Sequence, residues 1–167
     1  MLIVRERAGE GAGPATRELV LTFEQRSKSR LHATLVSGEP VGLVLPRGTL
    51  LRDGDRLVTD GGEVIAVRAA EEDVIDAHCD DAAALTRVAY HLGNRHASVQ
   101  IGDGFLRFAA DPVLAQMCER LGARLTARRA PFEPEPGAYA GGHHAHSGEA
   151  KHAGIIHDMI ERTRAGS

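Results

Sequence analysis

Alternating hydrophobic and polar positions predict several short strands in the first part of the chain. The segments rich in Val and Leu are 17–23, 31–36, 41–46 and 63–69. In the second of these segments, the two-residue repeat of a strand places Leu31, Ala33 and Leu35 on the inner face. His32 and Thr34 are then expected to face outward.

The stretches between these segments favour turns or solvated loops. The basic stretch EQRSKSR (24–30) is interpreted as such a loop. Because no helical pattern interrupts the strands, residues 1–70 are predicted to form a small all-β domain.

From about residue 71 the pattern alternates between strand and helix. Strand-like segments are 72–79, 96–101, 105–110 and 123–130. The stretch 80–92 carries an apolar helical stripe with Asp80 or Asp81 as its N-cap, and Gly93 is expected to end it in a left-handed conformation. A second helix starts with Asp111 as its N-cap and Pro112 in its first turn.

The resulting order of elements is β-α-β-β-α-β, with a hairpin predicted at the GDG sequence between the two middle strands. This order is typical of a ferredoxin-like domain, assigned to residues 71–134. Residues 135–167 lose the apolar periodicity and are predicted to be a flexible tail that contains histidines. The predicted fold class is therefore α+β with three parts.

Composition and charge exclude several classes of protein. The net charge of −3 gives no general attraction to nucleic acid or to anionic lipid. No apolar run approaches the roughly 18–20 residues that span a membrane, and the N-terminus has no secretory pattern. Cys79 and Cys118 form no C-x-x-C motif, which favours a reducing cytoplasm, and Cys118 belongs to a helix stripe.

Histidine is the unusual residue in this composition. Five of the nine histidines fall in the last 25 residues, and three of them form the HHAH motif: His143, His144 and His146. Imidazole is the usual nitrogen ligand for nickel, zinc and copper, so a glycine-flanked group of histidines favours metal binding. A solvated tail without a function, or an expression tag, is the alternative; a tag is disfavoured because the histidines are not contiguous and further native-like sequence follows.

Two of the three histidines in the predicted ferredoxin-like domain lie in YHLGNRH (90–96). Strand alternation puts Ala97, Val99 and Ile101 inward, which leaves His96 on the outer face next to a helix end. A structural role in a turn is the alternative for His96, because a single histidine is a weak motif. For His91, the alternative is a half-exposed residue on the flank of the helix.

Common enzyme motifs are missing from the sequence. The sequence contains no H-E-x-x-H, no G-x-S-x-G and no P-loop. A metal-dependent hydrolase using His91 and His96 ranks low, because no carboxylate has a spacing suited to a general base with them. The chain is therefore expected not to be an enzyme.

Several of these motifs together resemble the nickel chaperones of the UreE family of urease accessory proteins. The resemblance rests on YHLGNRH followed by VQI, and on the helix DPVLAQMCERLG (111–122). The segments 47–57 and 63–74 are similar to the family's junction between domains. A C-terminal tail with histidines is also typical of the family.

The resemblance implies a function and a set of ligands. It implies a homodimer formed through the C-terminal domains, with His96 of each subunit binding Ni²⁺ at the interface, while zinc or copper could compete. The tail residues His143, His144 and His146 would complete or supply that site, and His91 would be an accessory ligand. The N-terminal domain would dock partners, and nickel would pass to the urease accessory GTPase and the urease apoprotein complex.

Two departures from the family pattern limit what the resemblance implies. The stretch 109–112 reads AADP, where some members carry histidines, so a second fixed site there is doubtful. The modest number of tail histidines also speaks against large-capacity nickel storage. A second hypothesis therefore stays open, in which the β domain makes the protein a partner-binding adaptor and the tail only buffers metal.

Overall fold

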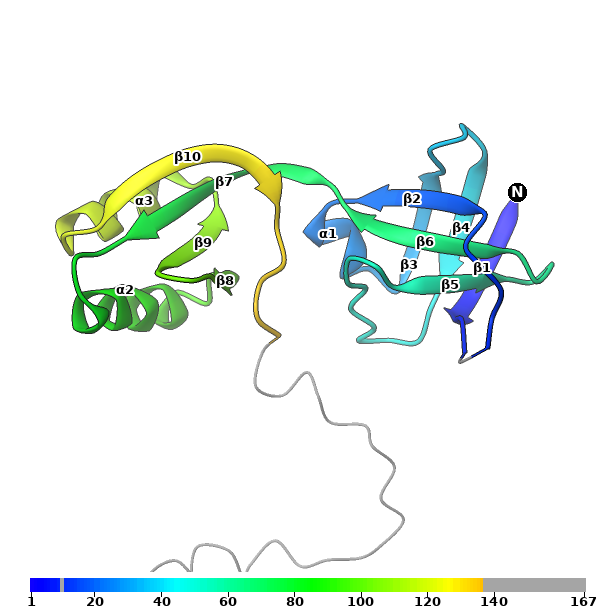
Figure 1. The fold of residues 1–167 in the computed structure, drawn as a ribbon, viewed down its shortest axis with the longest axis horizontal. Helices are drawn as coiled ribbons and strands as arrows, with labels where there is room; N and C mark the ends of the chain where they lie inside the picture. The colour runs from blue at the N-terminus through cyan, green and yellow to red at the C-terminus, as the bar shows by residue number, and fades with distance from the viewer. Residues whose placement is uncertain (10, 137–167) are drawn as a thin grey trace, which may run out of the picture. The chain divides into compact units, whose positions relative to one another are not determined.

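The structure is a computed structural model that describes residues 1–9 and 11–136 (Figure 1). It contains two β-sheets, one of six strands and one of four. We call them the N-terminal sheet and the C-terminal sheet. Most of the predicted tail, with His143, His144 and His146, lies outside the described residues. Within the described ranges, no helix is long and apolar enough to cross a membrane.

The N-terminal sheet has the strand order β2-β6-β5-β1-β4-β3. Its strands are β1 (Leu2–Arg7), β2 (Arg17–Leu21), β3 (Arg30–Thr34), β4 (Pro40–Val44), β5 (Arg56–Thr59) and β6 (Val64–Ala69). The four predicted strands are confirmed, whereas β1 and β5 were not predicted. Two pairs are parallel, β1 with β4 and β2 with β6, and the other pairs are antiparallel.

Aliphatic side chains fill the core of this sheet, because the chain has few aromatic residues. Leu35 is buried, and Leu31 and Ala33 pack against the same core, while His32 and Thr34 are exposed. The alternation predicted for this strand is therefore confirmed. The other buried members are Val4, Leu19, Leu21, Val41, Leu43, Leu45, Leu51, Leu57, Ile65 and Val67.

The basic stretch after β2 differs from its prediction as a solvated loop. It begins with the one-turn helix α1 (Phe23–Arg26), whose N-cap Thr22 forms a capping box with Gln25. Arg26 is fully buried. It is tolerated there because its guanidinium donates hydrogen bonds to the carbonyls of Leu21 and Leu51 and pairs with Glu133.

The C-terminal sheet has the strand order β10-β7-β9-β8, with all neighbours antiparallel. Its elements follow the predicted order along the chain. They are β7 (Glu71–His78), α2 (Ala82–Asn94), β8 (Val99–Ile101), β9 (Phe105–Ala109), α3 (Pro112–Arg120) and β10 (Arg124–Pro131). Val88 and Leu92 of α2 and Cys118 of α3 share one buried cluster with Ala77, Leu106 and Phe108 of the sheet.

A buried ion pair lies within this sheet, between neighbouring strands. Arg107 of β9 donates from Nε to Oδ1 of Asp76 at 2.7 Å and from Nη2 to Oδ2 at 3.0 Å. Asp76 is 2% exposed and Arg107 8%. The hydrogen bonds from Arg107 hold the pKa of the Asp76 carboxyl below its usual value. Strand alternation places both residues on the opposite face from Ala77 and Leu106 and hence from the helices.

Candidate metal site

The C-terminal end of α2 carries the two histidines predicted to bind metal. Gly93 does not end this helix as predicted, because the helix continues to Asn94 with Arg95 as its C-cap. The left-handed position belongs to His96, whose φ is 54°. Among the described residues, His96 is the only one other than glycine with a positive φ. The left-handed residue therefore lies three positions later than predicted, at the histidine itself.

The hydrogen bonds at this helix end explain the conformation of His96. The amide of His96 donates to the carbonyl of Gly93 at 2.9 Å, and the amide of Ala97 donates to that of Leu92 at 3.2 Å. These two bonds form a Schellman motif with His96 at the C′ position. Ala97 and Leu92 also belong to the same buried cluster, which supplies the hydrophobic contact of the motif.

The end of α3 has the same motif with a different residue at C′. Gly122 has a φ of 90°, its amide donates to Glu119 at 2.9 Å, and the amide of Ala123 donates to Cys118 at 3.0 Å. Glycine adopts this conformation without strain, whereas a residue with a Cβ costs roughly 1–2 kcal/mol there. The fold thus accepts strain at His96 that it avoids at the equivalent position of α3.

The strand after His96 sits at an edge of the C-terminal sheet. His96 and Ser98 are exposed, and Ala97 and Val99 pack against the core, as predicted. Ile101 was predicted to face inward, but it is 63% exposed. The difference follows from the position of β8, which has only three residues and pairs with β9 alone in the described chain. The imidazole of His96 is therefore presented to solvent at the start of an edge.

His91 lies in the last turn of α2 and is half-buried. Its ring stands edge-on to that of Tyr90, with centroids 5.4 Å apart and planes at 83°. Tyr90 itself is 65% exposed. The structure thus brings His91 and His96 to the same end of one helix.

The last described residues run beside β8. The amide of Glu135 donates to the carbonyl of Val99 at 2.8 Å, and that of Glu133 donates to Oε1 of Gln100 at 2.9 Å. Glu133 also pairs with Arg26 and Arg52. The chain therefore leaves the described region close to the strand that follows His96. Sequence reasoning missed these contacts, because they join residues 33 to 107 positions apart, which share no local pattern.

The described part of one chain does not complete a metal site. Within residues 1–9 and 11–136, no group of three or more His, Cys, Asp or Glu side chains could hold a metal ion. The cysteines do not supply a ready thiolate: burial raises the pKa of Cys118 to about 11, and burial also raises that of Cys79. The packing role expected for Cys118 is confirmed, because it is fully buried. Any site at His96 therefore needs further ligands.

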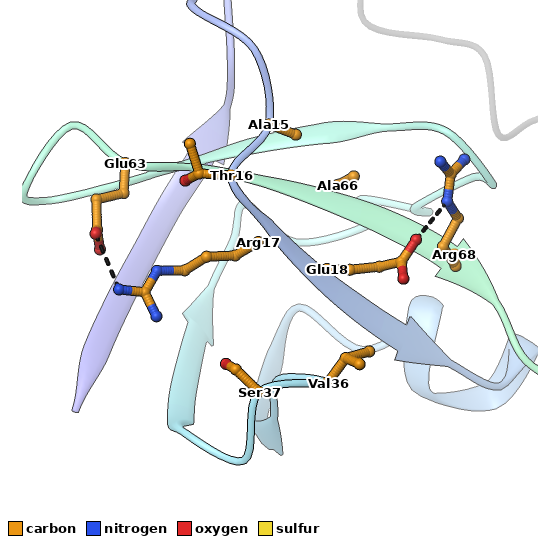
Figure 2. Close-up of a pocket in the computed structure, with 9 residues that line it drawn as sticks. All are labelled: Ala15, Thr16, Arg17, Glu18, Val36, Ser37, Glu63, Ala66 and Arg68. Carbon is orange, nitrogen blue, oxygen red and sulfur yellow. Dashed lines mark hydrogen bonds and ion pairs between the residues drawn. The ribbon is translucent and has the colours of Figure 1, made fainter.

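A cavity of about 760 Å³ at β2 and β6 of the N-terminal sheet offers no alternative metal site (Figure 2). No histidine or cysteine lines it. Its charged side chains neutralise one another, because Arg17 pairs with Glu63 and Arg68 with Glu18, each at a side of the cavity.

Both parts of the chain match models of known protein families. Residues 4–70 match the model of the UreE urease accessory protein, N-terminal domain, and residues 72–160 match that of its C-terminal domain. The chain belongs to the UreE urease accessory protein family. Its architecture is that of the family: an N-terminal all-β region followed by a C-terminal α+β region.

Similar proteins carry the same name. Over 129 residues, covering 77% of this chain, it is 56% identical to the "Urease accessory protein UreE" of Burkholderia ambifaria and 57% identical to that of Burkholderia thailandensis. These matches cover 64% and 61% of the two relatives, so the chain spans about three fifths of their length. The resemblance inferred from the sequence is confirmed. Because these are names of an accessory protein, the expectation that the chain is not an enzyme is confirmed as well.

Proposed function

We propose that this protein is a nickel-binding metallochaperone of the cytoplasm that delivers Ni²⁺ for assembly of the urease active site. The observation that carries the proposal is the strained, exposed His96 at the end of α2, where α3 uses an unstrained glycine. A turn of this kind needs no histidine for folding, so its presence favours a role for the imidazole. Imidazole is a preferred ligand of Ni²⁺.

The site is shared between two copies of the chain. One described chain offers too few ligands, so His96 of each subunit meets its equivalent across a two-fold axis of a homodimer. The ferredoxin-like domain, residues 71–134, forms the interface. Exposed apolar side chains on this part of the chain support such an interface: Tyr90, Ile101 and Val113 are each more than 60% exposed.

The tail histidines fill the remaining coordination positions, because two imidazoles do not saturate a metal that takes four to six ligands. The attachment of the chain beside β8 supports this role for His143, His144 and His146. Six residues separate Pro136 from His143, so the seven steps between them span at most about 25 Å. His91 is an accessory ligand in the same region.

Nickel can be released from this site because its ligands are exposed to solvent and to partner proteins. Nickel leaves by ligand exchange to the urease accessory GTPase and then to the urease apoprotein complex, while neither nucleic acid nor a membrane takes part. Zn²⁺ and Cu²⁺ compete for the same imidazoles, and by the usual order of stabilities copper binds more tightly in vitro. Metal availability and the partner, rather than affinity, then decide which metal is delivered.

Titration calorimetry with NiCl₂ tests the proposed ligands. We expect His96→Ala to abolish the tightest nickel site and His91→Ala, its neighbour on α2, to weaken it by a smaller factor. His32→Ala is the matched control, because His32 is an exposed histidine on the N-terminal sheet and should have no effect. Unchanged tight binding in His96→Ala would contradict the assignment.

The adaptor hypothesis predicts a different result when the N-terminal domain is removed. A chain lacking residues 1–70 should still bind nickel at the shared site if the protein is a metallochaperone, whereas an adaptor would lose its main activity with that domain. A metal-dependent hydrolase would show turnover with added metal that disappears in His96→Ala.

The pH dependence of nickel affinity tests whether imidazoles are the ligands. Imidazole binds metal only in its neutral form, and its reference pKa is about 6.5. Protonation competes with the metal below that value, so we expect affinity to be constant above about pH 7.5 and to fall as the pH drops below about 6. Equal affinity at pH 7.5 and pH 5.5 would contradict imidazole ligation.

A further inference from the structure

A short segment after β10 contacts both sheets of the protein. Residues 132–135, which we call the strap, follow the last strand of the C-terminal sheet. Hydrogen bonds join the strap to the N-terminal part on one side and to β8 on the other. Along the chain itself, the two sheets are joined by Ala70, the single residue between β6 and β7. The strap is therefore a second link between the sheets.

Two arginines hold the strap from the N-terminal side. The buried guanidinium of Arg26 donates to the carbonyl of Phe132 and pairs with the carboxylate of Glu133. Arg52 donates to the carbonyl of Pro134 at 2.7 Å and to Glu133 at 3.3 Å. Burial lowers the pKa of Arg26, and the negative charge of Glu133 opposes this change. The charged form of the buried arginine therefore depends on Glu133, so that each holds the other in place.

Apolar packing and prolines give the strap a fixed course. The ring of Phe132 is 2% exposed and stands edge-on to that of Phe23 in α1, with centroids 5.5 Å apart. Prolines occupy three of the six positions 131–136 and restrict the backbone there. Because the strap is stiff, fixing it at Glu133 also fixes the position of Glu135.

The other side of the strap contacts the strand that follows His96. The amide of Glu135 donates to the carbonyl of Val99 at 2.8 Å, and that of Glu133 donates to Oε1 of Gln100 at 2.9 Å. Val99 is three residues from His96, a span of at most about 11 Å. The tail therefore starts near the exposed imidazole.

We propose that Arg26 and Glu133 are positioning residues for the metal site. They fix the strap beside β8 and so set the point from which the tail histidines reach His96, although neither residue contacts the metal. This role rests on the proposed function, because it concerns the ligands that complete the shared site. It goes beyond that function by giving a buried arginine of the N-terminal part a role in nickel binding.

The length of free chain sets the size of the expected effect. Eight residue steps separate Glu135 from His143, whereas a tail released at Ala130, the buried residue of β10, has thirteen. The effective concentration of a tethered ligand falls roughly as the −3/2 power of the tether length, or more steeply. Release of the strap should therefore lower the effective concentration of the tail histidines at the site at least about twofold.

Hydrogen exchange of the full chain without metal tests whether Glu133 holds the strap. Glu133→Lys places a second positive charge beside the buried Arg26, which should repel the strap. We expect protection of the amide of Glu135, which bonds to Val99, to fall at least about tenfold. An unprotected Glu135 amide in the unchanged protein, or equal protection in the variant, would overturn the proposal.

Nickel titration of two chain lengths separates positioning from folding. The chains are the full protein and one that ends at Gly142, which lacks all five histidines of the tail. The ratio of their nickel affinities measures what the tail contributes. We expect Glu133→Lys to lower this ratio at least about twofold. A residue that only stabilised the fold would weaken both chains by the same factor, so an unchanged ratio would contradict the positioning role.

Glu135→Lys is the matched control for Glu133→Lys. It makes the same change of charge two residues further along the strap, where the side chain is exposed and the contact to β8 comes from the backbone amide. We expect neither the affinity ratio nor the protection of that amide, corrected for its intrinsic exchange rate, to change. An equal fall of the ratio in both variants would assign the effect to charge near the site and would overturn the proposal.

Arg52→Glu keeps the test decisive if Glu133→Lys does not fold. Arg52 is 28% exposed, so the change leaves Arg26 in place while it removes the bond to Pro134 and repels Glu133. The affinity ratio should fall here too. Arg5→Glu, which reverses an exposed arginine of β1, is the control with the same change of charge. An unchanged ratio with a released strap would show that the strap does not position the tail.

The shared metal site and the positioning role fail in different ways. If the unchanged chain ending at Gly142 bound no nickel, the shared site would be wrong, and the positioning role with it. If that chain bound nickel that is lost in His96→Ala, while Glu133→Lys left the affinity ratio unchanged, only the positioning role would be wrong.

Discussion

The two helices of the C-terminal part end in the same motif with different residues. Helix α3 ends on Gly122, which adopts the left-handed conformation freely, whereas α2 ends on His96, which does so at a cost. Both motifs have the same two hydrogen bonds and the same alanine after the C′ residue, Ala97 and Ala123. The geometry of the backbone is therefore not what distinguishes the two ends.

The difference between His96 and Gly122 indicates that the histidine at position 96 does not serve the stability of the fold. Its imidazole is exposed and forms no hydrogen bond with the described residues. No hydrogen bond of this side chain therefore offsets the backbone strain. Histidine is tolerated in the left-handed region better than a branched residue, but glycine would be better still. A metal site shared between two subunits needs an imidazole that a second chain can reach, and His96 is exposed at the start of an edge strand, so this helix end supports the proposed function.

The largest loss of stability should come from a change in the sheet against which both helices pack. Asp76→Asn leaves Arg107 buried without its charge partner, and we expect it to lower the free energy of unfolding by about 3–5 kcal/mol. Denaturant titration measures this loss. The control is Asp73→Asn on the same strand, where the exposed pair with Arg129 should contribute less than about 1 kcal/mol.

The same pair predicts how stability depends on pH. Because the folded pKa of Asp76 lies below its unfolded value, the folded protein binds fewer protons there, and stability rises with pH. The contribution is complete above the unfolded pKa of about 3.9 and is lost as the pH falls through the folded value. Asp76→Asn should lack this part of the acid transition; an unchanged transition would contradict the role given to the pair.

A change at position 96 should affect metal binding and stability in opposite directions. His96→Gly removes the ligand, so we expect nickel affinity at the shared site to fall about 100-fold or more, as typical for loss of a metal ligand or its support. The same change relieves the strain and should raise the free energy of unfolding by about 1 kcal/mol. Calorimetry and denaturant titration measure the two effects. A loss of stability would show that the imidazole supports the fold.

The reciprocal change at α3 should have the smallest effect. Gly122→His has room for its Cβ, because no described residue except its two chain neighbours comes within 4 Å of that position. Only the backbone strain remains, so we expect the free energy of unfolding to fall by about 1 kcal/mol without any new tight nickel site. If this variant were as stable as the unchanged protein, the strain assigned to His96 would be wrong.

Local patterns in the sequence predicted much of the fold. Alternation identified the inner and outer faces of β3, and the caps Asp81 and Asp111 marked the starts of both helices. The strand β1 was missed because LIVRER ends in three charged residues, and β5 because RLVT has only four residues. Ile101 was assigned to the core because alternation does not show where an edge strand loses its cover.

The details of the site depend on contacts that no local pattern contains. Gly93 appeared to be the better helix end, but the Schellman bonds from His96 and Ala97 place the left-handed residue three positions later. Arg26 was assigned to a solvated loop, although carbonyls and Glu133 from distant segments satisfy it inside the fold. The exposure of His96 itself followed from alternation and was predicted correctly.

Native mass spectrometry of a chain ending at Gly142, with and without His96→Ala, tests the central claim most directly. This chain keeps all described residues and lacks His143, His144 and His146. The shared site predicts a dimer that carries one tightly bound nickel per two chains and loses it in His96→Ala. Loss of all nickel on removal of the tail, with no effect of His96→Ala in the intact protein, would instead make His96 a structural turn residue and the tail the only metal-binding part.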